Sequence, residues 1–310
     1  MHDLTIIIVT WNARPYIEDC LRSVAPSLSR YSSRIIVVDN NSSDGTPSLV
    51  EMGFSDVHLI KNKENVGFAG GNNQALRLAR SKFVLLLNPD AIIRPGGLDV
   101  LIDCMLAHAD AWAVGPAMLN GDGTPQRTGV RFPNTWNLLV ESLFLDRVFP
   151  QSRLFGSHKE LYEDPTRVRP VDYLQGACLM VRHEAIERVG LLDEDFFMYF
   201  EETDWCYRMS RAGGRVYYCP TAVVVHHGGG DVGHYDERRL VYFYESLLLF
   251  YRKHRTKGQS IGARCIVVLR SCVRLATWLI VLTIKPSLRS NALSSLKGYW
   301  RVLGLAFRRV

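Results

Sequence analysis

The chain has 310 residues, of which 47% are hydrophobic and 22% are charged. This composition is typical of a folded globular protein and excludes a disordered chain, and the length suits one large α/β unit with an appendage or two modest domains. The seven cysteines include no Cys-x-x-Cys pair, which argues against a zinc ribbon and for a reducing compartment. Because a β-type apolar run begins at Thr5, we expect no cleavable signal peptide.

The net charge of +6 is unevenly distributed along the chain. From Arg238 to the end there are 15 Lys and Arg residues and one acid, Glu245, so this tail carries about +14 and the rest of the chain about −8. A basic tail suits contact with an anionic membrane or with nucleic acid, and it is also compatible with a solvated basic surface.

The first hundred residues alternate between strand-like and helix-like segments. Apolar, β-branched runs occupy residues 5–9, 34–38, 57–60 and 83–87. Strands that are apolar throughout must be buried on both faces, so the pattern predicts a mostly parallel sheet covered by helices. In such a sheet, ligands bind at the carboxyl ends of the strands.

Polar residues follow three of these four runs. They are Thr10 and Asn12 after the first, Asp39 and Asn41 after the second, and Asn88 and Asp90 after the fourth. Carboxylate, amide and hydroxyl groups are therefore expected together at one edge of the sheet. A dinucleotide-binding Rossmann site would instead have Gly-x-Gly-x-x-Gly after the first strand, and the sequence has none there.

A glycine-rich segment, residues 65–73, precedes a helix-like stretch. Backbone N–H groups at the start of a helix can bind a phosphate, but ordinary helix entry with capping by asparagine explains the segment equally well. Residues 112–170 are less regular and suit a substrate-specific insertion.

The segment 171–208 is again regular. We expect strand structure around Gly176, a helix over 183–189 and a helix that begins near Glu201. In that helix Asp204 and Arg208 are four residues apart on one face and can form an ion pair. Strand-like runs at 215–219 and 222–225 follow, and the second ends at His226.

The basic tail begins with a helix-like segment, residues 237–254, and continues with the mostly apolar segment 265–284. Its longest uncharged stretch, residues 275–284, is shorter than the roughly 20 residues that a membrane-spanning helix needs. An interfacial or re-entrant helix flanked by basic residues fits this pattern, and a buried core helix is the alternative.

Taken in order, these motifs resemble glycosyltransferase family 2, in particular its bacterial rhamnosyltransferase-like branch. The matching segments are residues 7–12, 37–46, 65–68, 87–90, 176–180, 192–197, 201–208 and 226–229. The resemblance implies an α/β protein with the GT-A fold, here with a basic, amphipathic helical tail. We expect a catalytic domain over 1–236, with a nucleotide-sugar half (1–115) and an acceptor half (116–236), followed by a membrane-associating tail over 237–310.

The resemblance also implies a nucleoside diphosphate-sugar donor and inversion at the anomeric carbon by direct displacement. Asp39 matches the carboxylate that contacts the nucleotide base in this family, and Thr10 and Asn12 line the same pocket. The polar strand ends that carry Asn41, Asn88 and Asp90 complete the expected nucleotide site.

A divalent cation, Mn²⁺ or Mg²⁺, is implied as well. Asp90 matches the last residue of the family's Asp-x-Asp metal motif, whereas Asn88 stands where the first aspartate is usual. The single carboxylate is expected to weaken cation binding in the absence of donor, although Mg²⁺ is commonly held by one or two carboxylates plus substrate phosphates. His226 matches a histidine that completes the metal site in some members and favours Mn²⁺, unless it is only a polar strand end.

The general base is expected in the acidic pair Glu201 and Glu202, because the family places it at the start of a helix. We favour Glu201 over Glu202, although both also suit the helix dipole. Asp204 is expected to pair with Arg208 rather than to contact the acceptor. Gly176, in the separate matching segment 176–180, is a further acceptor-side or structural candidate.

The resulting hypothesis is transfer of L-rhamnose from dTDP-rhamnose to a lipid-linked glycan, in cell-envelope polysaccharide synthesis. The basic tail would associate peripherally with the anionic cytoplasmic face of the inner membrane. One alternative is a UDP-hexose or UDP-N-acetylhexosamine donor. Another is a non-catalytic nucleotide- or glycan-binding regulator, and Asn88 is the only residue that supports it. We expect no nucleic-acid partner, because residues 242–255 are better explained as an amphipathic helix.

Overall fold

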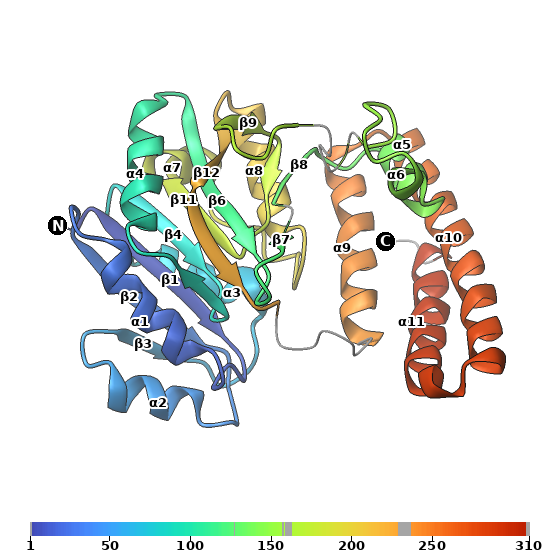
Figure 1. Ribbon diagram of the computed structural model, residues 1–310, viewed down its shortest axis with the longest axis horizontal. Helices are drawn as coiled ribbons and strands as arrows, with labels where there is room; N and C mark the ends of the chain where they lie inside the picture. Colours follow the sequence, from blue (N-terminus) through green and yellow to red (C-terminus); the bar gives the residue numbers. More distant parts are fainter. Residues whose placement is uncertain (1, 127, 157, 159–162, 229–236, 308–310) are drawn as a thin grey trace. The chain divides into compact units, whose positions relative to one another are not determined.

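The computed structural model describes residues 2–126, 128–156, 158, 163–228 and 237–307 (Figure 1). The chain forms two compact units: Met1–Phe132, Glu163–Phe197 and Glu201–Gly230 in the first, and Pro133–Tyr162, Met198–Phe200 and Asp231–Val310 in the second. The sequence-based boundaries after residues 115 and 236 stay predictions. Gly229, the last residue of the matched motif at 226–229, lies outside the described residues.

The first unit contains the parallel sheet expected from the sequence. All four apolar runs form strands, β1 (Leu4–Thr10), β2 (Ser33–Asp39), β3 (His58–Lys61) and β4 (Phe83–Leu87), in the order β3-β2-β1-β4 (Figure 1). The helices α1 (Ile17–Ser27), α2 (Thr46–Gly53) and α3 (Gly67–Leu76) connect these strands, and α4 (Gly97–Ala107) follows them. Thr10 lies opposite Asp39 in the register of β1 and β2, so both strands end at the same edge.

The rest of this sheet is mixed in direction. Strand β11 (Cys178–Arg182) lies antiparallel between β4 and β6 (Ala111–Leu119), and β12 (Arg215–His226) runs parallel to β6. The two runs expected near residues 215 and 225 form this single strand, which has an irregularity between Cys219 and Val223. Short strands β5 (Ala91–Ile93), β7 (Pro125–Gln126) and β9 (Arg169–Val171) pair with it or with β6, and β8 (Gly129–Val130) pairs with β10 (Tyr173–Leu174).

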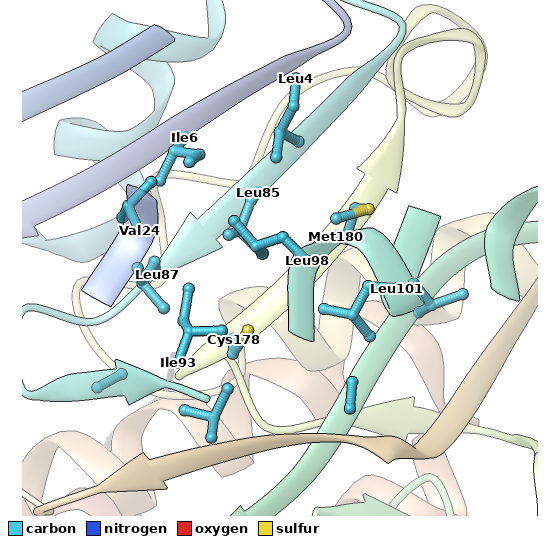
Figure 2. Packing of buried hydrophobic residues seen from close by; sticks show 14 of the residues in the cluster. Leu4, Ile6, Val24, Leu85, Leu87, Ile93, Leu98, Leu101, Cys178 and Met180 are labelled. Carbon is cyan, nitrogen blue, oxygen red and sulfur yellow. The ribbon is translucent and has the colours of Figure 1, made fainter. Parts of the chain in front are cut away.

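Helices cover both faces of the sheet because alternate residues of its strands point to opposite sides. Leu4, Ile6 and Ile8 pack with residues of α1 and α4, while Ile7 and Val9 pack with residues of α3, α7 (His183–Val189) and α8 (Glu201–Arg211). Figure 2 shows the first of these two clusters, in which side chains of β1, β4 and β11 meet those of α1 and α4. This two-sided burial holds the strand ends, and the polar residues after them, in place.

The second unit is helical, and it includes the helical tail that the sequence predicted from residue 237 onward. It contains α5 (Thr135–Ser142), α6 (Leu145–Val148), α9 (Glu237–His254), α10 (Lys257–Ile284), the 3-10 turn Pro286–Leu288 and α11 (Arg289–Phe307). Helices α9, α10 and α11 pack on one another. Thr256 begins α10 with a capping box, in which its side chain accepts from the backbone of Gln259.

Few residues of helix α10 are buried, although most of its residues are apolar. An 18-residue window within it is long and apolar enough, by length and composition only, to cross a membrane, and 11% of that window is buried. Ala263, Val267 and Ser271 are its buried residues. The alternative of a buried core helix therefore does not apply to α10 in this structure.

Candidate active site

Asp39 lies at the end of β2 with its side chain fixed by neighbouring polar groups. It is 2% exposed, its Oδ1 accepts a hydrogen bond from Thr10 Oγ1 at 3.0 Å, and its Oδ2 accepts from the backbone N–H of Ser42 at 2.9 Å. Buried carboxylates are retained when such donors satisfy them. The structure thus brings Thr10 and Asp39 together in a fixed geometry at the carboxyl edge of the sheet.

The loops after β1 and β2 contain two residues in left-handed backbone conformation. Asn12 has φ 52° and Asn41 has φ 63°, values that asparagine tolerates better than most side chains. The loops are tied together, because Asn12 N–H donates to Ser42 Oγ at 2.8 Å and Asn12 Oδ1 accepts from the N–H of Ser43 at 2.9 Å. Both asparagines are exposed at this edge, and unusual backbone conformations of this kind concentrate at functional sites.

The glycine-rich segment forms the entry to α3. The N–H of Gly67 donates to Asn65 Oδ1 at 2.9 Å, and the N–H of Phe68 donates to the carbonyl of Phe197 at 3.1 Å. Because these first N–H groups have protein acceptors, the structure favours ordinary helix entry over phosphate binding here. A Cβ atom at Gly71 would lie 2.8 Å from Val9 Cγ1, so a glycine is needed for α3 to pack closely on β1.

Asn88, Asp90 and His226 meet beyond the end of β4. His226 comes from the end of β12, where it pairs with Ala91 of β5, the residue directly after Asp90. Its Nε2 atom lies 3.4 Å from Asp90 Oδ1 and 3.3 Å from Asn88 Nδ2. The pairing of β5 with β12 thus brings the two predicted metal ligands, Asp90 and His226, into contact although they are far apart in the sequence.

The pair Asp90 and His226 has a spacing that suits a divalent cation. Two neighbouring ligands of an octahedral ion bound at about 2.1 Å are about 3 Å apart, close to the observed 3.4 Å. Within the described part of the chain, no group of three His, Cys, Asp or Glu side chains could hold a metal ion. The residues therefore fit a cation that takes its remaining ligands from water or from the phosphates of a donor.

The acidic pair occupies the first turn of α8, as the sequence predicted. Glu201 is 6% exposed and Glu202 is partly buried, and the Oε2 atom of each has no hydrogen-bond partner among the described residues. Burial, together with the neighbouring Glu202 charge, raises the pKa of Glu201 well above its ordinary value. Burial also raises the pKa of Glu202, to about 7, against the opposing effect of hydrogen bonds from nearby backbone N–H groups.

Gly176 and Ala177 link this acidic pair to the end of β4. The backbone N–H of Gly176 is one of the nearby groups that oppose the rise in the pKa of Glu202, and the carbonyl of Ala177 accepts from the N–H of Asn88 at 2.9 Å. Because β4 is also the neighbour of β1, Asn88 and its partner Ala177 lie at the same carboxyl edge as the ends of β1 and β2.

Asp204 and Arg208 form the ion pair expected from their spacing. Asp204 is 1% exposed, and Arg208 Nε donates to its Oδ2 at 2.7 Å. The same guanidinium donates to the carbonyl of Leu191 at 2.8 Å and to the carbonyl of Val189. Arg208 thus joins α8 to the end of α7, which supports a structural role for this pair.

Gln126 of β7 is a site residue that sequence reasoning missed. It contacts His226 through both ends of its amide group. The sequence does show a turn at 120–123, but nothing in a single sequence indicates that the residue after this turn reaches a histidine 100 positions away.

A cavity of about 450 Å³ lies away from this edge. It is lined by His2, Asp3, Arg80, Ser81, Lys82, Arg182, His183, Glu184 and Glu187. Asp3 and Lys82 directly precede β1 and β4, so the cavity opens at the amino edge of the sheet. None of the predicted site residues lines it, and it is not part of the candidate site.

The comparison with family models identifies the chain. The model of Glycosyl transferase family 2 matches residues 5–190, more than half of the sequence. The chain belongs to glycosyl transferase family 2. This confirms the family inferred from the ordered motifs, and the protein is a glycosyltransferase. The matched residues include β1 to β4 and Gly176, whereas α8 and His226 lie beyond them.

Several relatives are similar over most of the chain. The N-acetylglucosaminyl-diphospho-decaprenol L-rhamnosyltransferase of Mycobacterium tuberculosis is 28% identical over 258 residues, which cover 80% of this chain and 83% of that protein. Rhamnosyltransferase WbbL of Escherichia coli is 26% identical, with 75% and 84% covered. The low-salt glycan biosynthesis hexosyltransferase Agl10 of Haloferax volcanii is 28% identical, with 78% and 73% covered.

Solved structures agree on the fold of this family 2 member. A mannosyltransferase of Pyrobaculum calidifontis in complex with GDP-Man and Mn²⁺ is 18% identical with a TM-score of 0.57, and 98% of this chain and 86% of that chain are covered. TarS residues 1–349 of S. aureus are 15% identical with a TM-score of 0.53, with 97% and 90% covered. The GT-A fold expected from the sequence is confirmed.

Proposed function

We propose that this family 2 glycosyltransferase transfers L-rhamnose from dTDP-rhamnose, with inversion, to a lipid-linked glycan during cell-envelope polysaccharide synthesis. The proposal is carried by one arrangement: a buried acidic pair connected through Gly176 and Ala177 to the edge that holds Asp90 and His226. The names of two relatives support rhamnose as the sugar, and one of these names includes a decaprenol diphosphate acceptor.

Donor binding is assigned to the polar residues at the ends of β1, β2 and β4. Asp39, held by Thr10 and Ser42, presents a fixed carboxylate for the N3–H of a thymine or uracil base. Asn12 and Asn41 line the loops beside it. The diphosphate would then lie toward Asn88 and Asp90, beyond the neighbouring strand β4.

Asp90 and His226 are the residues that would hold a divalent cation, Mn²⁺ or Mg²⁺, together with the donor diphosphate. When bound, such a cation stabilises the charge of the departing nucleoside diphosphate. His226 supplies an imidazole, which Mn²⁺ accepts more readily than Mg²⁺ does.

Glu202 is the residue that we assign as the general base. A base must be ionised near working pH and must reach the acceptor hydroxyl, and its ideal pKa lies near the operating pH. The pKa of Glu202, raised to about 7, meets this requirement. Glu201 is the more deeply buried of the two, and burial together with the neighbouring Glu202 charge holds its pKa well above the ordinary value. The sequence-based preference for Glu201 remains untested, and this assignment replaces it as our proposal.

With Glu202 as base, the transfer step is a single displacement. The Glu202 carboxylate takes the proton of the acceptor hydroxyl while that oxygen forms a bond to the anomeric carbon of the sugar. The bond from the anomeric carbon to the diphosphate oxygen breaks at the same time, and its electron pair leaves with the nucleoside diphosphate. One such displacement inverts the anomeric configuration.

Helix α10 supports peripheral association with the cytoplasmic face of the membrane. Its exposed side is apolar, with Ile261, Leu269, Leu279, Ile280 and Ile284 between 45% and 68% exposed. Its arginines at 264, 270 and 274 are only partly exposed, so the charge does not cover the outer side of the helix.

Trp300 and Phe307 of α11 are also exposed, at 71% and 75%, alongside basic residues such as Lys297 and Arg301. An exposed apolar surface with cationic neighbours and no acid after Glu245 suits an anionic lipid interface.

A donor panel tests the proposed function. The full-length protein with Mn²⁺ and an undecaprenyl-type diphospho-GlcNAc acceptor should release dTDP from dTDP-rhamnose and give a product of inverted anomeric configuration. Release of UDP from a UDP-hexose or UDP-N-acetylhexosamine instead would change the sugar and keep the enzyme class. Nucleotide binding without turnover of any donor would favour the non-catalytic regulator.

A further inference from the structure

Gln126 contacts His226 at two points and Asn120 at a third. Its amide nitrogen Nε2 donates to the backbone carbonyl of His226 at 2.6 Å and to Asn120 Oδ1 at 2.7 Å. Its amide oxygen Oε1 lies 3.0 Å from the ring nitrogen Nδ1 of His226. The side chain therefore bridges the backbone and the ring of the same histidine.

These contacts determine which ring nitrogen of His226 carries the proton. A backbone carbonyl only accepts hydrogen bonds, so the NH₂ end of Gln126 must face it and the oxygen must face Nδ1. Because the amide oxygen also only accepts, Nδ1 must carry the hydrogen. In the neutral ring the other nitrogen, Nε2, then carries the lone pair, which is directed toward Asp90 and Asn88.

The contact with Asn88 agrees with this tautomer. Asn88 Nδ2 lies 3.3 Å from His226 Nε2 and can donate to the lone pair there. With Gln126 on one ring nitrogen and Asn88 on the other, the imidazole is held from both sides. A cation that binds Nε2 would take the place of the Asn88 amide there, and the ring would not need to turn.

We propose that Gln126 is a positioning residue that holds His226 in the Nδ1–H tautomer, so that its Nε2 lone pair is available to a divalent cation beside Asp90. The inference rests on the proposed function, which assigns His226 to the cation. A hydrogen-bond acceptor on the second nitrogen of a metal-binding histidine fixes ring orientation and tautomer and raises ligand basicity, and its loss typically lowers metal affinity about 10- to 100-fold.

The test compares the full-length wild type with Gln126→Met, which keeps the length of the side chain and removes the amide. Mn²⁺ affinity is measured by electron paramagnetic resonance in the presence of dTDP. We expect the dissociation constant to rise about 10-fold or more. Thr124→Val is the matched control, because it removes the hydroxyl that receives Asn120 Nδ2 in the same turn and leaves both contacts between Gln126 and His226. It should change Mn²⁺ affinity less than about two-fold.

A spectroscopic measurement tests the tautomer without any cation. In long-range ¹H–¹⁵N spectra of the wild type, with the His226 signals assigned by their loss in His226→Gln, we expect the pattern of a protonated Nδ1 and an unprotonated Nε2. Gln126→Met should shift this pattern toward a mixture of tautomers. A protonated Nε2 in the wild type would overturn the inference. This outcome does not depend on Gln126→Met, so it holds even if that variant does not fold.

The outcomes separate this inference from the proposed function. If the wild type binds Mn²⁺ with dTDP and Gln126→Met binds it equally well, the role of Gln126 is wrong and the cation site stands. If the wild type binds no Mn²⁺ with dTDP, the assignment of His226 to a cation fails, and with it the positioning role of Gln126.

Discussion

The backbone of Gly176 lies against the side chain of Glu202: a Cβ atom at Gly176 would be 3.5 Å from both Cβ and Cγ of Glu202. The nearby backbone N–H of Gly176 favours the charged form of the Glu202 carboxyl, while burial favours the neutral form. The balance leaves the pKa of Glu202 at about 7, within the range that suits a general base.

Substituting this carboxylate should stop transfer and spare donor binding. We expect Glu202→Gln to lower kcat by about 100-fold or more, because a general base typically contributes 10²- to 10⁴-fold. The dissociation constant for the nucleotide, measured by calorimetry, should change less than about three-fold. Glu201→Gln should lower kcat less than Glu202→Gln does, and the exposed Glu18→Gln is the control. A larger effect at Glu201 would return the base to that residue.

The pH dependence of transfer follows from the raised pKa of Glu202. The base works only when ionised, and a pKa of about 7 means that it is mostly protonated below that pH. We expect kcat/KM to rise about ten-fold per pH unit below pH 7 and to level off above it. Initial rates between pH 5 and pH 9 in a buffer of constant ionic strength measure this. A profile that is flat down to pH 5 would mean that a base of ordinary carboxyl pKa acts instead.

The ion pair of Asp204 and Arg208 predicts a large effect on stability. Arg208→Ala removes the guanidinium that pairs with the 1%-exposed Asp204 and that binds the carbonyls of Val189 and Leu191. Breaking a buried pair in this way costs about 3–5 kcal/mol of unfolding free energy. Urea denaturation followed by circular dichroism measures it.

The matched control for this stability prediction is Arg22→Ala. Arg22 also pairs four residues away, with Glu18, but its side chain is 66% exposed. Its loss should therefore cost less than about 1 kcal/mol. If both variants lose the same free energy, the Asp204 pair does not have the structural role that we assign to it.

The neutral side chain of Asn88 leads to a prediction about Mn²⁺ affinity, which should increase when a second carboxylate is added at this position. Asn88→Asp places a second carboxylate within reach of His226 and Asp90, where the wild type has a neutral amide. We expect Mn²⁺ binding without donor to become about 10-fold tighter, because a carboxylate is a stronger ligand for a divalent cation than an amide is. Titration by electron paramagnetic resonance without nucleotide measures this, and unchanged affinity would place the cation elsewhere.

The exposed apolar side of α10 predicts the membrane behaviour. The double substitution Leu279→Glu and Ile280→Glu adds two charges at positions 54% and 58% exposed. We expect the double variant not to float with vesicles that contain anionic lipid. The wild type should float with them, and its flotation should weaken as the salt concentration rises. Met52→Glu, at an 83% exposed position of the first unit, should float like the wild type. Equal flotation of both variants would exclude α10 as the binding surface.

Much of the parallel half of the sheet was predictable from the sequence. Runs of β-branched residues identify strands that are buried on both faces, and parallel strands separated by helices must end at one edge. Thr10, Asp39 and Asn88 could therefore be placed at that edge without a structure. The spacing of Asp204 and Arg208 likewise predicted their ion pair, because helical geometry alone brings residues four apart together.

The tertiary structure decided the contacts between distant segments. Whether β11 lies antiparallel between β4 and β6, and whether β12 pairs with β5 so that His226 reaches Asp90, depends on which buried surfaces fit one another. The same holds for Gln126, and for Gly176 against Glu202. Periodicity in a sequence reflects only local geometry and burial of one segment, whereas the partners of a strand end or of a buried carboxyl are set by packing across the whole sheet.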